Sequence, residues 1–272
     1  MTRTLLLTAH DERSDRDALA LALDLAGPLD ARIVVGGVVV PGGEDDHKAR
    51  EDLAGELDTL EASIPDGVES EIRSVDAVSL VAGLHQLAED LDAELVVLGA
   101  QHRNAVLRAL RGDIATELTS DGTWGVAVAH EDRASGPPRR VGVAWDQTPA
   151  ANVALEWGIQ LVERTGGELQ ILRVFDPRHR EGTKPWKHDE VRLASAEEEA
   201  ALRVNAKARV IWGDAGPELV AASRDLDLLV MGSSGHGGVR RVLSGSVSRR
   251  LLHDARCSVA VMPAAAHGGP DE

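Results

Sequence analysis

The stretch Leu228-Leu229-Val230-Met231-Gly232 has a near copy in Leu95-Val96-Val97-Leu98-Gly99, 133 positions earlier in the chain. The same offset holds further on, where residues 256–262 (RCSVAVM) match residues 123–129 (TWGVAVA). A repeat that keeps its offset across such a distance indicates two copies of one domain. Both repeated stretches are apolar runs without alternation, which is typical of strands that are covered on both faces of a parallel sheet.

A polar segment separates the two copies. Residues 131–138 read EDRASGPP, and the two consecutive prolines at its end favour an extended linker. A length of 272 residues is enough for two domains of ordinary size. We expect this division: a domain at 1–130, a linker at 131–138, a domain at 139–263 and a tail at 264–272.

Strand and helix patterns alternate within each copy. In the second copy we expect strands at 141–145, 169–174, 208–212, 228–231 and 258–262. Between them we expect helices at 150–164, 191–205, 217–224 and 247–254, and a polar loop at 176–188. Thr148 and Pro149 suit the N-cap and the first residue of the first of these helices. The pattern predicts an α/β fold, in which each domain is a doubly wound parallel sheet with helices on both faces.

Composition and charge exclude several classes of protein. The net charge of −16 argues against nucleic-acid binding, which depends on basic patches. The single cysteine, Cys257, excludes a disulfide framework, and we expect it to be buried in the core. No apolar stretch is long enough to span a bilayer, so we expect a cytoplasmic protein without membrane insertion. Residues 1–132 carry a charge of −17, whereas residues 133–272 carry +1.

A glycine-rich segment follows the strand at 228–231. Gly232 and Gly235 are followed by nine residues and then by Gly245-Ser246. Glycines allow a sharp turn and a close approach of the backbone to a bulky anion. A helix that opens at Gly245-Ser246 would present free N–H groups and a positive dipole end to phosphate. A flexible loop with a serine-capped helix is the plainer alternative, but the place after a strand, at the edge where ligands bind in such sheets, favours a phosphate site.

The spacing G-x2-G-x9-G-[ST] after a strand resembles the nucleotide-binding signature of the universal stress protein family, and the order of elements resembles that family as a tandem pair over nearly the whole chain. The resemblance implies five strands per domain in the order 3-2-1-4-5, as in the adenine nucleotide alpha hydrolase-like fold. It also implies that the fifth strands of the two domains pair within the chain as a pseudo-dimer. Association of two chains into a homodimer is left open.

The resemblance further implies ATP as the ligand, with or without Mg²⁺, and a site in the second domain. Asp146 would contact the nucleoside, and Val174 and Met231 would flank the adenine. The residues that would hold the phosphates are Gly232, Gly235, Gly245, Ser246 and Val247. His236 would reach the phosphates or a phosphate-bound metal, or would be an exposed loop residue.

Plainer roles remain open for the other side chains. Asp146 would organise the turn into Thr148, and Val174 and Met231 would be ordinary core residues. Most members of the family carry proline where this chain has Ala144, which weakens the detail of the adenine wall but not the phosphate site.

The first copy has lost the same motif. His102 stands in place of the second glycine, Asp113 in place of the serine, and His10 in place of Asp146. Asp113 and Glu117 would put two carboxylates near a triphosphate, which costs several kcal/mol without a cation. We therefore expect the first domain not to bind ATP.

Nucleotide binding for stress adaptation is the leading function, with one site per chain and a regulatory role. Slow ATP hydrolysis or autophosphorylation is an alternative, with Ser233, Ser234, Ser244 or Ser248 as acceptors. A partner-binding scaffold with a vestigial site is a second alternative. An adenylating enzyme is a third, although the serine-glycine loop such enzymes carry after the first strand is absent here.

Overall fold

The computed structural model describes residues 2–9, 12–42, 45–99, 114–115, 117–118, 122–131, 135–176, 185–233 and 246–264, of which 12–14, 185–189 and 246 are described by their backbone alone. Strands and helices alternate along both halves of the chain. The N-terminal half holds β1 (Arg3–Thr8), α1 (Glu12–Leu29), β2 (Ala31–Val39), α2 (Asp46–Glu61), β3 (Ser70–Asp76), α3 (Leu80–Asp90), β4 (Leu95–Leu98) and β5 (Gly125–Val128). The C-terminal half holds β6 (Arg140–Ala144), α5 (Pro149–Thr165), β7 (Glu168–Phe175), α6 (Pro185–Ala201), β8 (Asn205–Trp212), α7 (Ala215–Ala222), β9 (Leu228–Gly232), α8 (Ser246–Asp254) and β10 (Ser258–Met262).

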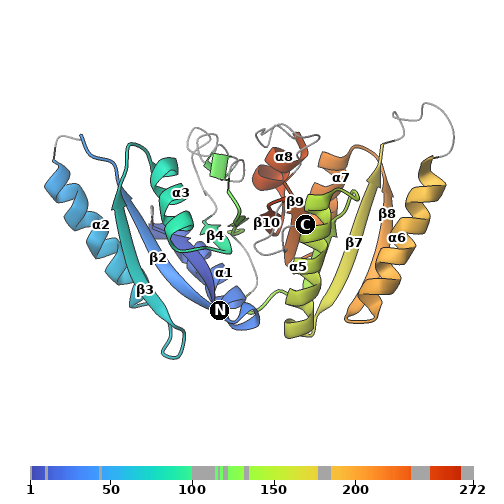
Figure 1. The fold of residues 1–272 in the computed structure, drawn as a ribbon, viewed down its shortest axis with the longest axis horizontal. Helices are drawn as coiled ribbons and strands as arrows, with labels where there is room; N and C mark the ends of the chain where they lie inside the picture. The colour runs from blue at the N-terminus through green and yellow to red at the C-terminus, as the bar shows by residue number, and fades with distance from the viewer. Residues whose placement is uncertain are drawn as a thin grey trace, which may run out of the picture.

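The strands of the described chain join into one ten-stranded sheet in the order β3-β2-β1-β4-β5-β10-β9-β6-β7-β8. Within each half all strand pairs are parallel and the order is 3-2-1-4-5, which confirms the predicted fold class. The last strands of the two halves, β5 and β10, pair antiparallel, with Ala127 opposite Ala260. One sheet therefore runs through both halves, which lie side by side with β4 and β10 near the middle (Figure 1).

Both faces of this sheet are covered by helices. Leu5 and Leu7 of β1 belong to the same core cluster as residues of α1, whereas Leu6 belongs to the cluster that contains residues of α3. All three leucines are fully buried. Successive strand residues point to opposite faces, so an uninterrupted leucine run is what a strand covered on both sides requires.

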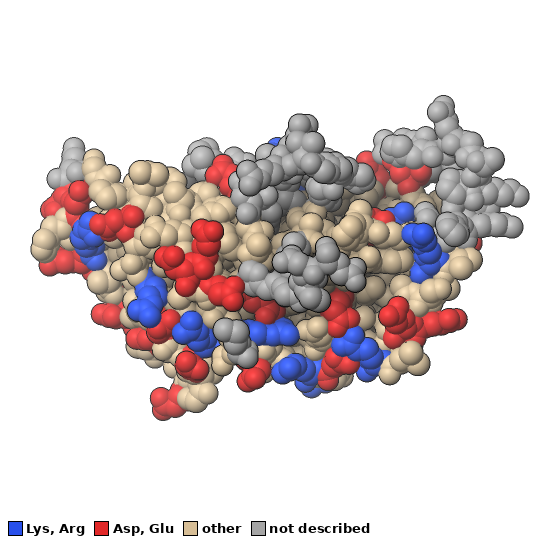
Figure 2. All heavy atoms as spheres, in the orientation of Figure 1, with Lys and Arg blue, Asp and Glu red and all other residues tan. Residues whose placement is uncertain are grey.

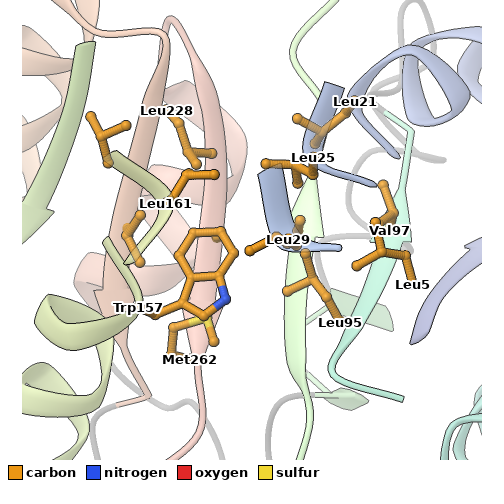
Figure 3. Close-up of a cluster of buried hydrophobic side chains, with 14 of the residues drawn as sticks. Leu5, Leu21, Leu25, Leu29, Leu95, Val97, Trp157, Leu161, Leu228 and Met262 are labelled. Carbon is orange, nitrogen blue, oxygen red and sulfur yellow. The ribbon is translucent and has the colours of Figure 1, made fainter. Parts of the chain in front are cut away.

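The largest core cluster crosses from one half to the other. Leu25 and Leu29 of α1 belong to it together with Trp157 and Leu161 of α5. Figure 3 shows Trp157 between side chains of the two halves, with Leu29 close to its ring. The two halves therefore bury apolar surface against each other, as one domain does in its own interior.

Polar contacts reinforce this junction. Trp157 Nε1 donates a hydrogen bond to Glu94 Oε1 at 2.9 Å, and Arg3 Nη1 donates to the same oxygen at 3.0 Å. Arg3 Nη2 also donates to Gln160 Oε1 at 2.8 Å, which again joins the N-terminal half to α5. Glu94 thus satisfies a buried indole N–H and an ion pair at once.

The expected start of α5 is confirmed. Thr148 is its N-cap, whose Oγ1 accepts a hydrogen bond from the N–H of Ala151 at 3.2 Å, and Pro149 is the first helical residue. The helix ends at Gly166, whose φ of 65° is left-handed and whose N–H bonds to the carbonyl of Val162. Threonine at the cap, proline at the first position and glycine after the end are the residues that each place favours.

The expected boundary between the loop 176–188 and the helix 191–205 is wrong. The helix α6 spans Pro185–Ala201, so it begins and ends earlier than its apolar pattern predicts. Proline fits a first helical turn because the N–H that it lacks has no partner there. At the other end Arg203 Nε donates to Glu163 of α5 at 2.8 Å, which holds the chain in the turn before β8.

The charge asymmetry of the sequence maps onto the two halves. Figure 2 shows acidic and basic side chains over both halves of the face it presents, with a group of acidic side chains near the inner part of the N-terminal half. Among the described helices none combines the length and the apolar character that a membrane span requires.

Candidate functional site

The predicted site lies where the strand order of the C-terminal half reverses. The strand β6 has β7 on one side and β9 on the other, and Ala144 at its end pairs with Leu172 and with Met231. The carboxyl ends of all three strands meet at one edge of the sheet, because the strands are parallel. In open α/β sheets ligands bind at this edge, beside the strand that marks the reversal.

Three of the predicted site residues share one apolar cluster at this edge. Met231 is 5% exposed, and the half-buried Val174 and Val247 pack against the same cluster, as does Ala144. The cluster joins the ends of β6, β7 and β9 to the first turn of α8. Met231 is therefore a core residue, and Val174 and Val247 offer the apolar surface that remains accessible.

Asp146 lies two residues after the end of β6 and is exposed. Its Oδ1 accepts hydrogen bonds from the backbone N–H of Thr148 at 3.1 Å and from Thr148 Oγ1 at 2.6 Å. Asp146 therefore organises the turn into α5, as the plainer alternative has it. Among the described residues none donates a hydrogen bond to its Oδ2, so this oxygen is free to bind a ligand hydroxyl or amine.

Gly232 is required by packing rather than by a sharp turn. It is the last residue of β9, and its φ is not positive, so the expected turn does not begin there. A Cβ at this position would lie 2.4 Å from the carbonyl carbon of Ala150 and 2.5 Å from the backbone nitrogen of Ala151. The missing side chain lets the first turn of α5 pack directly on β9.

Two helices therefore begin near the carboxyl edge of the sheet: α5, whose first turn lies against Gly232, and α8, whose Val247 packs against the cluster that contains Met231. The positive dipole ends of both point toward the edge where an anion would bind. The exposed Arg249 and Arg250 add positive charge in α8. The predicted residues Gly235, His236 and Gly245 lie outside the described residues, and so does the side chain of Ser246.

Two further features at this edge escape prediction from the sequence. Arg192 of α6 donates from Nη1 to Gln147 Oε1 at 3.0 Å, and Gln147, with a φ of 71°, is the residue after Asp146. Phe175 and Trp212, the last residues of β7 and β8, lie with their ring centroids 5.3 Å apart. The pairing of Arg192 with Gln147 has no local sequence signal, because the two residues are 45 positions apart.

Other predictions have mixed outcomes. Cys257 is buried, as expected, and burial raises the pKa of its thiol to about 12. Among the described residues no group of three or more His, Cys, Asp or Glu side chains could hold a metal ion. His10, His102 and Asp113 lie outside the described residues, so the loss of the motif in the N-terminal half stays a prediction.

Comparison with known proteins gives the same result for both halves. The model of the universal stress protein family matches residues 1–130 and again residues 138–263. Universal stress protein Rv2005c of Mycobacterium tuberculosis is 30% identical over 196 residues, which cover 62% of this chain and 62% of that protein. Universal stress protein Rv2624c of the same organism is 32% identical over 126 residues, which cover 44% of this chain and 46% of that protein. The match thus spans less than two thirds of the length of these curated relatives.

Solved structures share the whole two-domain fold. The crystal structure of a universal stress protein from Archaeoglobus fulgidus superimposes with a TM-score of 0.75 at 20% identity and covers 96% of both chains. A functionally unknown protein of Pseudomonas aeruginosa, PA1789, superimposes with a TM-score of 0.65 at 14% identity and covers 96% of this chain and 92% of its own. At these identities the likeness concerns the fold alone.

Proposed function

Because this chain belongs to the universal stress protein family, we propose that its C-terminal half binds one adenine nucleotide, ATP in the first instance, as a regulatory ligand in the response to stress. The observation that carries the proposal is the meeting of three strand ends and two helix N-termini around the cluster of Val174, Met231 and Val247. The glycine and serine spacing begins at Gly232, the last residue of β9, and ends at Ser246, the first residue of α8.

Each part of a nucleotide has a chemically suitable place at this edge. The half-buried Val174 and Val247 suit the flat, weakly polar adenine. The free Oδ2 of Asp146 suits a ribose hydroxyl or the exocyclic amine. The N-terminus of α8 and the segment before it suit the phosphates, with Gly232, Gly235, Gly245 and Ser246 in the roles that the family motif gives them. A Mg²⁺ ion and His236 would act on the phosphates.

A regulatory role agrees better with the described residues than rapid catalysis. Fast phosphoryl transfer needs a group that activates the attacking oxygen and carboxylates that hold the metal. Asp146 is the carboxylate that we place at this edge, and its Oδ1 already holds the turn into α5. Slow hydrolysis or autophosphorylation is compatible with the same binding mode and has the same first test.

Calorimetric titration of the nucleotide-free full chain with ATP tests the proposal. The chain itself offers a matched pair of variants, since Gly245 and Gly112 occupy equivalent positions in the two halves. Gly245→Asp adds a carboxylate where the phosphates would bind, and Gly112→Asp adds the same group at the equivalent position of the other half. We expect one nucleotide per chain, a loss of binding in Gly245→Asp and unchanged binding in Gly112→Asp.

Other outcomes have definite meanings. Two nucleotides per chain would contradict the predicted loss of the N-terminal site. Loss of binding in Gly112→Asp but not in Gly245→Asp would move the site to the N-terminal half. An absence of binding to the wild-type chain would refute the proposal and favour a scaffold that binds other proteins. Asp146→Asn separates the two roles of that side chain, since the amide still accepts from Thr148 but carries no charge.

A further inference from the structure

A cavity of about 540 Å³ lies between the two halves of the chain. The N-terminal half contributes residues of α3 and the ends of β1, β4 and β5, and the C-terminal half contributes residues of α7, α8 and the segment that leads into β10. Its volume falls within the range of about 300–1,000 Å³ that is common for sites of small molecules. The pairing of β5 with β10 places these walls opposite one another.

Much of this cavity is apolar. Leu84 of α3 and Leu98 of β4 line it from the N-terminal half, and Val220, Leu252 and Val259 line it from the C-terminal half. Leu252 packs against core clusters of both halves. A ligand with an apolar body would therefore exchange water for carbon contacts on both sides.

The acidic side chains that line the cavity have interaction partners, whereas two of its arginines form no ion pair among the described residues. Asp254 forms an ion pair with Arg250 at 3.6 Å, and Asp15 and Glu131 also have interaction partners. Arg224 and Arg256, in contrast, have no carboxylate partner among the described residues. Both arginine side chains are exposed, so their guanidinium groups are accessible to an anion.

Ser223 joins the two backbone segments that carry these arginines. Its Oγ accepts a hydrogen bond from the backbone N–H of Arg256 at 2.8 Å and donates to the carbonyl of Val220 at 2.7 Å. Ser223 is fully buried and is the residue before Arg224, so one buried hydroxyl joins both arginine-bearing segments. His130, His253 and the thiol of Cys257 also line the cavity.

The cavity also occupies an informative place in the repeat. Leu98, Gly99 and Ile114 line it, and they stand 133 positions before Met231, Gly232 and Val247. The N-terminal half thus has its cavity at the corner that is equivalent to the proposed nucleotide site. Here the corner opens toward α7 and α8 of the other half, and the acidic Asp15 and Glu131 lie beside it. This environment disfavours a triphosphate and suits a ligand with one negative charge.

We propose that this cavity binds a small amphipathic anion, whose apolar body lies between the two halves and whose single carboxylate, sulfonate or phosphate group is bound by Arg224 and Arg256. Guanidinium groups form paired, charge-assisted hydrogen bonds with such head groups. The ligand would contact both halves, so its binding would stabilise their junction. It would not compete with a nucleotide at the C-terminal site.

The probe is 8-anilinonaphthalene-1-sulfonate, which has an apolar ring system and one sulfonate. Its fluorescence is titrated with the folded full chain in the presence of saturating ATP, so that the C-terminal site is occupied. We expect saturable binding at one site and displacement by octanoate. Octan-1-ol has the same number of carbons but no charge and should displace the probe at least about tenfold less well, since a hydrogen bond to a charged group contributes about 1.5–3 kcal/mol.

Two sets of variants localise the site. The double variant Arg224→Gln with Arg256→Gln should weaken probe binding by at least about tenfold. Arg209→Gln is the matched control, because Arg209 is an exposed arginine on the outer strand β8. Val220→Trp, which fills the cavity from α7, should also weaken binding, and circular dichroism checks that each variant is folded.

The outcomes separate this proposal from the proposed function. Unchanged binding in the double arginine variant, or equal displacement by octanoate and octan-1-ol, would overturn it and leave an adventitious apolar site only. Weaker probe binding with saturating ATP than without ATP would also overturn it. Gly245→Asp should leave probe binding intact even though it removes nucleotide binding, so each proposal can fail while the other stands.

Discussion

The contact between Gly232 and the first turn of α5 leads to the sharpest prediction. In Gly232→Ala the new methyl group would lie 2.4–2.6 Å from the backbone of Ala150 and Ala151, whereas ordinary contacts begin near 3.4 Å. The helix would have to move by about 1 Å away from β9, and all three atoms concerned are backbone atoms that cannot rotate away. Overpacking of this kind costs about 1–3 kcal/mol.

Urea unfolding of the full chain, followed by circular dichroism, measures this cost. We expect a lower midpoint and an unchanged slope for Gly232→Ala. The matched control is Gly55→Ala in the exposed interior of α2, where a Cβ has open space within 4 Å and alanine favours the helix by about 0.5–1 kcal/mol. If Gly232→Ala unfolds at the same urea concentration as the wild type, the close packing of α5 on β9 is refuted.

Three further predictions concern the junction and the buried groups. Glu94→Ala leaves the indole N–H of Trp157 without its acceptor, so thermal unfolding should show a free energy of unfolding lower by about 1–3 kcal/mol. Glu94→Gln keeps an acceptor oxygen and should lower the free energy of unfolding less. Equal losses in the two variants would contradict this role of Glu94. Burial raises the pKa of Asp227, but hydrogen bonds from the side chain and backbone of Arg140 outweigh it and hold the pKa below its ordinary value. The stabilisation of the folded state by the ionised Asp227 is therefore present above the ordinary pKa of about 4 and is lost as the pH falls below it. Asp227→Asn should be less stable than the wild type at pH 7, and the difference in stability should shrink at acid pH. A difference in stability that does not depend on pH would disprove this linkage. Cys257 should resist Ellman's reagent at pH 8 in the folded chain and react once per chain in denaturant, because burial raises the pKa of its thiol to about 12; rapid labelling of the native state would show that it is accessible.

Local signals in the sequence predict much of the fold. Thr148 and Pro149 carry the start of α5 in their own chemistry, and Ser258 to Met262 form a strand with the expected bounds. The apolar pattern predicts both ends of α6 wrongly. The helix begins at Pro185, outside that pattern, and the chain after it is held by the ion pair of Arg203 with α5.

The candidate site is only partly readable in the same way. The resemblance indicates Val174, Met231 and Val247, and the structure brings them into one cluster. The sequence does not show why position 232 requires glycine. The requirement comes from the close packing of α5 on β9, and α5 begins 83 positions earlier in the chain. The contact of Arg192 with Gln147 depends in the same way on how α6 packs, not on its local pattern.

The antiparallel join of β5 to β10 has a consequence for how the two halves were free to diverge. In an isologous dimer of identical subunits, every charge gained by one surface is gained by its partner, and an excess of like charge is doubled across the interface. Here the facing surfaces are encoded separately, so a half with a charge of −17 adjoins a half with a charge of +1. In one chain with two separately encoded halves this constraint of self-complementarity is absent, so a substitution in one half is not repeated in the other.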